Sequence, residues 1–138
     1  MEDILNMAMI QVRVIVLFVF AKCLRPWVLI QEGYESIKLF LLSFPNFCEA
    51  IVGVLTLTGI GIYLNKDLKI SNRLVYITAI AIAGIFVITQ ELKVHNLGGN
   101  NTYDPNDLIF SLIGLLTASS IVFKLQPKMK KSNKSPIV

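Results

Sequence analysis

Six ionisable side chains of this chain have types and positions that suit a polar binding site. They are four acids and two bases: Glu49, Glu91, Asp104, Asp107, Lys22 and Arg25. Each lies near the end of an apolar stretch. A helix rises about 1.5 Å per residue, so if these stretches are helices, all six lie within about one to two turns of the same depth. Such carboxylates would bind a cation, a proton or a polar lipid headgroup, with Lys22 or Arg25 as counter-charges.

The acids also have ordinary structural interpretations. Glu91 can reach water at a membrane interface and pair there with Lys or Arg. The run Asp104-Pro105-Asn106-Asp107 can cap a helix that begins near Asp107, and both carboxylates suit the positive end of its dipole. The sequence leaves the capping and binding interpretations open.

The elements that must position these residues follow from composition. Of 138 residues, 54% are hydrophobic and 16% charged, against about 25% charged in ordinary soluble domains. Spanning a membrane takes about 20 mostly apolar residues, and four segments qualify: about 4–24, 44–64, 74–92 and 108–125. We therefore predict an all-α bundle of four transmembrane helices over residues 1–126. We expect residues 31–42 to form an amphipathic stretch along the interface, and 127–138 to be a disordered basic tail.

The distribution of Lys and Arg predicts the orientation. One side of the membrane carries eight, namely Lys66, Lys69, Arg73, Lys124, Lys128, Lys130, Lys131 and Lys134, and the other carries four, namely Lys22, Arg25, Lys38 and Lys93. Basic residues favour the cytoplasmic side. Both termini are therefore predicted to be cytoplasmic, and the six polar residues to lie at the outer face.

Other functions find less support. The lysines of the tail are not interleaved with aromatics, so nucleic-acid binding is not predicted. The two cysteines, Cys23 and Cys48, and the single His95 give no metal spacing, and no metal or cofactor is expected. Arg13 is expected to extend toward the cytoplasmic interface, with a buried ion pair as the alternative. Small residues at three- and four-residue spacing on segments 74–92 and 108–125 predict close helix packing.

The second half of the chain resembles the VanZ-like family of membrane proteins. The matching features are ITQE at 88–91, then NTYDPNDLI at 101–109, then Ser111 and Gly114. The stretch SFPNF at 43–47, which contains Asn46, is similar to the helix entry of some members. Many members have Asn where Ser111 stands, an Arg in the loop, and a Gln shortly after the acid.

The resemblance implies a bacterial plasma-membrane protein. The family's namesake is associated with low-level resistance to a glycopeptide antibiotic that binds cell-wall precursors. By that resemblance, an outward-facing acidic pocket would contact lipid-linked envelope precursors or the antibiotic. The alternative is a small structural or assembly subunit of a larger membrane complex. A transporter or enzyme is less favoured, because no nucleophile with its base, phosphate loop or broken helix pair is recognisable.

Overall fold

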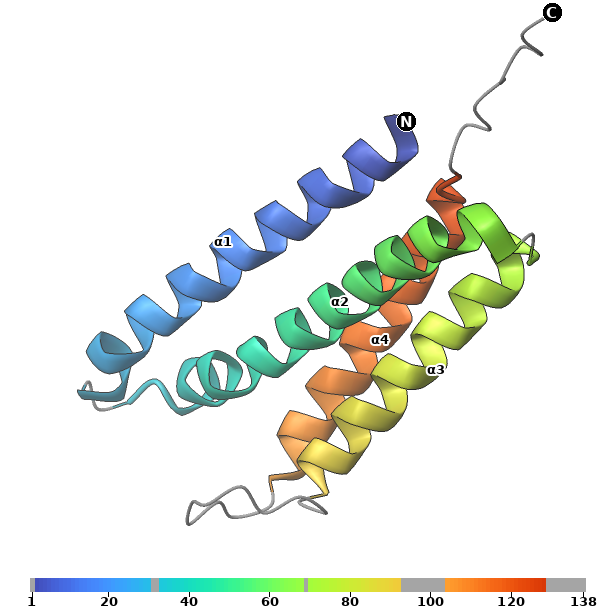
Figure 1. Ribbon diagram of the computed structural model, residues 1–138. Coiled ribbons are helices and arrows are strands. Elements are labelled where there is room, and N and C mark those ends of the chain that lie inside the picture. Colours follow the sequence, from blue (N-terminus) through green and yellow to red (C-terminus); the bar gives the residue numbers. More distant parts are fainter. Residues whose placement is uncertain (1, 31–32, 69, 93–103, 129–138) are drawn as a thin grey trace, which may run out of the picture.

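The computed structural model describes residues 2–30, 33–68, 70–92 and 104–128, and these residues form four helices and no strand. The helices are α1 (Glu2–Ile30), α2 (Glu35–Leu68), α3 (Asn72–Glu91) and α4 (Pro105–Leu125). Successive helices alternate in direction, so α1 begins and α4 ends at the same end of the bundle (Figure 1). All four are long and apolar enough to cross a membrane. The predicted all-α class is confirmed, and the fold is compatible with a multi-pass membrane protein. Its orientation stays a prediction.

Helix α1 is longer than predicted. The prediction ended it at about residue 24, but the helix continues through Pro26 to Ile30. Proline removes one backbone hydrogen bond, and membrane helices tolerate that loss when neighbouring groups compensate. Residues 27–30 are all apolar and continue the lipid-compatible surface beyond the proline.

Helix α2 also begins earlier than predicted. Residues 35–42, expected as part of a separate amphipathic stretch over 31–42, are the first turns of α2, and Pro45 lies inside the helix. In Figure 1 these cyan turns run in a different direction from the rest of α2. The Phe44 ring lies 5.0 Å from the Phe40 ring on one side of the proline and 5.7 Å from the Phe47 ring on the other. These aromatic contacts hold the helix together where proline removes a hydrogen bond.

The bundle is organised around α2, which packs against all three other helices, whereas α1 packs mainly on α2 and has no contact with α3 in the described residues. The predicted packing role of the small residues is confirmed. Buried small residues are Ala79 and Ala83 on α3, and Ser111, Gly114 and Ala118 on α4. Residues without large side chains let helices approach closely inside a membrane.

The first two residues of the predicted disordered tail, 127 and 128, have a defined structure after α4. The prediction began the tail at residue 127, but Pro127 is fully buried. Its carbonyl oxygen accepts a hydrogen bond of 2.8 Å from the Tyr76 hydroxyl of α3. A buried tyrosine hydroxyl needs a partner, and the chain leaving α4 supplies it. The rest of the predicted tail, from residue 129, lies outside the described residues.

Candidate functional site

The acid that ends α3 is joined to α4 by a direct contact. Ser111 Oγ donates to Glu91 Oε1 at 3.3 Å. This is longer than the usual 2.5–3.0 Å of an O–H···O bond, so it is a weak one. Ser111 is buried, whereas Glu91 is half-buried. The Glu91 carboxylate therefore lies at the edge of the helix interface and is partly exposed.

Asp107 lies beside this pair. It precedes Ser111 by four residues on α4, and side chains at that spacing are neighbours on one helix face, about 5–6 Å apart at Cβ. Its Oδ1 atom is buried and has no hydrogen-bond partner among the described residues. A buried oxygen without a donor costs free energy, about 1–3 kcal/mol and more for a charged group. Asp107 therefore offers an unused acceptor to a bound cation, N–H or O–H group.

Ser43 on α2 contributes a second unsatisfied polar group. Its side chain is fully buried, and its Oγ has no hydrogen-bond partner in the described part of the chain. The Phe40 and Phe110 rings are 5.7 Å apart, and Gly114 approaches the Phe47 carbonyl. Ser43 lies between Phe40 and Phe47, so it is level with the start of α4. In the sequence, Ser43 is the first residue of the SFPNF stretch, and a serine before Pro45 resembles an ordinary helix start, so its burial could not be expected.

Asp104 has the capping role. Its Oδ1 accepts hydrogen bonds from the Asn106 backbone N–H at 2.9 Å and from Asn106 Nδ2 at 2.8 Å. The prediction placed the helix start near Asp107, but α4 begins at Pro105, one residue after this cap. Proline suits the first helical position, where its missing N–H costs nothing. Asp104 therefore fixes the start of α4, and the unsatisfied oxygen at this end belongs to Asp107.

Glu49, Lys22 and Arg25 lie elsewhere. All three are exposed, and Lys22 Nζ lies 4.4 Å from the centre of the Phe18 ring. None of them makes an ion pair in the described residues, where the salt bridge that forms is Lys38–Glu35. Lys22 and Arg25 are on α1, which does not contact α3. The structure therefore does not bring these two bases to Glu91, and their role as counter-charges stays a prediction.

The register between α1 and α2 still places Lys22 and Glu49 at similar depth. Gln11 Nε2 donates to Thr56 Oγ1 at 2.7 Å, and Met7 lies against Gly59. Because the two helices run in opposite directions (Figure 1), continuing this register brings Lys22 within about one turn of Glu49. This register concerns Lys22 and Glu49 alone, and the common depth of all six residues stays a prediction. The Gln11–Thr56 bond itself was missed, although polar side chains often join membrane helices.

The glycine of the family-like motif has a packing role. A Cβ on Gly114 would lie 2.5 Å from the Phe47 carbonyl oxygen and 2.9 Å from Ala50 Cβ. No other residue fits without moving the backbone of α2. Asn46, also part of the motif, is half-buried on α2. Gly114 lets α4 approach α2 and so places Ser111, one turn earlier, inside the interface.

Two remaining predictions concern single residues. Arg13 is exposed on α1, so it does not form the buried ion pair that was the alternative. His95 lies outside the described residues. Within the described ranges, no group of three His, Cys, Asp or Glu residues is placed to hold a metal ion. Cys23 is exposed and Cys48 buried, and both are free thiols.

Comparison with family models, curated proteins and solved structures found no match. The chain is an all-helical protein with four helices able to span a membrane. The resemblance to the VanZ-like family therefore rests on the motif residues alone.

Proposed function

We propose that this chain is a VanZ-like multi-pass protein of a bacterial plasma membrane, and that Glu91 and Asp107 bind a polar ligand at its outer surface. The supporting observation is the buried Oδ1 atom of Asp107, which has no donor within the described residues and lies one turn from Ser111. The partly exposed carboxylate of Glu91 is held to the same serine. Two acids that both neighbour Ser111 would bind an amine or several hydroxyl groups.

The ligand class follows from this chemistry and from the predicted orientation. Lipid-linked envelope precursors carry hydroxyl and amine groups at the outer membrane surface, and glycopeptide antibiotics carry amines and sugars. Charge-assisted hydrogen bonds from such donors to carboxylates are about twice as strong as neutral ones. We expect the site to bind one of these molecules and not to act as a catalyst.

Antibiotic susceptibility tests the proposal. The chain is expressed in a susceptible bacterium, and the inhibitory concentration of a glycopeptide antibiotic is measured for the wild type and for Glu91→Gln and Asp107→Asn. The wild type should raise this concentration, and both variants should lose the increase. Glu49→Gln is the matched control, because Glu49 is an exposed acid that makes no ion pair in the described residues. Full protection by both site variants at equal expression would contradict the proposal.

One observation favours a second function, that of an assembly subunit. Helix α1 exposes large apolar side chains along its length, and Trp27 and Ile30 are 77% and 83% exposed. Lipid can cover such a surface, and so can a partner helix. Mass measurement of the mildly extracted protein distinguishes lipid from a partner helix, because a lone 15.4 kDa chain would count against an assembly role.

A further inference from the structure

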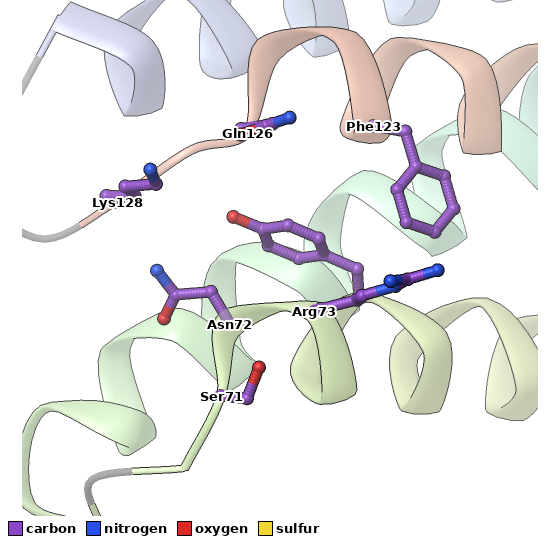
Figure 2. Close-up of a pocket in the computed structure, with 7 residues that line it drawn as sticks. Ser71, Asn72, Arg73, Phe123, Gln126 and Lys128 are labelled. Carbon is purple, nitrogen blue, oxygen red and sulfur yellow. The ribbon is translucent and has the colours of Figure 1, made fainter.

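A cavity lies at the opposite end of the bundle from Glu91, between the start of α3 and the segment that follows α4. Its volume is about 350 Å³. Figure 2 shows Asn72 and Arg73 projecting from the start of α3, with Gln126 and Lys128 on the segment after α4. This volume lies within the range of about 300–1,000 Å³ that is typical of small-ligand sites.

The cavity is held open by ordered contacts. Gln126 adopts a left-handed conformation with φ of 43°, and its backbone N–H donates to the Val122 carbonyl at 2.9 Å. The chain then turns so that Pro127 is buried and accepts the hydrogen bond from Tyr76. These contacts fix the position of Lys128 relative to α3. Lys128 therefore has a defined position in the lining of the cavity.

The lining is suited to an anion. Arg73 and Lys128 supply two positive charges, and Ser71 and Asn72 add hydrogen-bond donors. No acidic side chain lines the cavity in the described part of the chain. Figure 2 shows Arg73 below the Phe123 ring and Lys128 at the other side of the cavity, so the two cations lie at opposite sides of its lining. The Phe123 ring adds an apolar wall.

We propose that this cavity binds the phosphate group of an anionic phospholipid. Basic pockets between membrane helices on the cytoplasmic side are suited to anionic headgroups. The cavity is at the end of the bundle that carries the excess of Lys and Arg, and the sequence continues with Lys130, Lys131 and Lys134. A lipid places its phosphate at this depth and its glycerol and acyl chains beside Phe123. The inference is independent of the function proposed for the opposite end.

Native mass spectrometry of the full chain in detergent tests this site. Retention of phosphatidylglycerol is compared with that of phosphatidylcholine, whose headgroup has no net charge. The wild type should prefer phosphatidylglycerol, and Arg73→Gln and Lys128→Gln should each weaken its binding about fivefold. Lys124→Gln is the matched control, because Lys124 is exposed at the same end but does not line the cavity. It should stay within about twofold of the wild type, since charges outside the cavity are screened.

The outcomes separate the sources of the phosphate. A preference that persists in excess inorganic phosphate supports the lipid, whereas displacement supports phosphate binding and assigns the cavity to the free anion. Lys128 follows the last helix, so its variant should fold even if Arg73→Gln does not. Three results would overturn the proposal: equal retention of the two lipids by the wild type, wild-type retention by Lys128→Gln, or equal weakening by Lys128→Gln and Lys124→Gln.

Discussion

Gly114 on α4 lies against the carbonyl oxygen of Phe47 on α2, at a separation that leaves no room for a side chain. This contact sets how closely the two helices pack. It also determines the position of Ser111, one turn away, and through Ser111 that of Glu91. The stability of the bundle and the geometry of the acidic site therefore both depend on how closely α4 packs against α2 at Gly114.

Replacing this glycine should destabilise the bundle. In Gly114→Ala the new methyl group would lie 2.5 Å from the Phe47 oxygen, so α2 and α4 must separate. Overpacking of this kind costs about 1–3 kcal/mol. Thermal unfolding followed by circular dichroism in detergent should show a lower midpoint. Gly53→Ala is the control, because nothing lies within 4 Å of its new methyl group, and alanine is the better helix former. An unchanged midpoint in Gly114→Ala would show that the helices pack less closely.

The hydrogen bond from Gln11 to Thr56 should couple α1 to α2. It is 2.7 Å long and links two helices within their apolar segments. Double-mutant cycles for such bonds in membranes average about 0.6 kcal/mol. Gln11→Leu, Thr56→Val and the double variant should give a coupling free energy near this value in mixed-micelle unfolding. A coupling of zero would mean that α1 is held by apolar packing alone.

Asp104 and Asp107 should behave differently on substitution. Asp104→Ala removes the cap of α4 and should lower the free energy of unfolding by about 1 kcal/mol, whereas Asp104→Asn keeps an acceptor and should have little effect. Asp107→Asn should leave stability unchanged or raise it, because the buried Oδ1 has no donor among the described residues. Unfolding in detergent measures all three. A large loss of stability in Asp107→Asn would assign Asp107 a structural role.

Thr58 allows the cost of an unsatisfied hydroxyl in the core to be measured. Its side chain is fully buried, and its Oγ1 has no hydrogen-bond partner among the described residues. Thr58→Val removes this group and should raise the free energy of unfolding by about 1 kcal/mol. Thr117→Val should be close to neutral, since Thr117 is only half-buried and its hydroxyl donates to the Ile113 carbonyl of its own helix, a bond that adds little to helix stability. A destabilised Thr58→Val would point to a buried water or ligand on that hydroxyl.

The sequence predicted the four helices well because apolar runs of this length have few alternatives in a membrane. It predicted boundaries poorly at Pro26 and Pro45, where a proline resembles a helix end. In the structure both helices continue, and at Pro45 the rings of Phe40, Phe44 and Phe47 pack across the interruption. Such contacts depend on side-chain positions that local sequence patterns do not specify.

The candidate site was predicted only in part. The depth of the polar residues follows from helix rise, and this reasoning identified Glu91 and Asp107. It could not separate the faces of the bundle, because α2 stands between α1 and α3. Lys22 and Arg25 lie on α1, which packs on α2, so they belong to another surface than Glu91. The burial of Ser43 without a hydrogen-bond partner in the described residues becomes visible only once the packing of α2 on α4 is known.

In the orientation we propose, the acidic site faces the outside of the cell and the basic cavity faces the inside. This orientation is tested by labelling with a membrane-impermeant maleimide in a Cys23→Ser, Cys48→Ala background. Asn106→Cys marks the acidic end and Lys128→Cys the basic end. We predict labelling of Asn106→Cys in intact cells and of Lys128→Cys only after permeabilisation. The reverse pattern would invert the bundle and contradict the account of both sites.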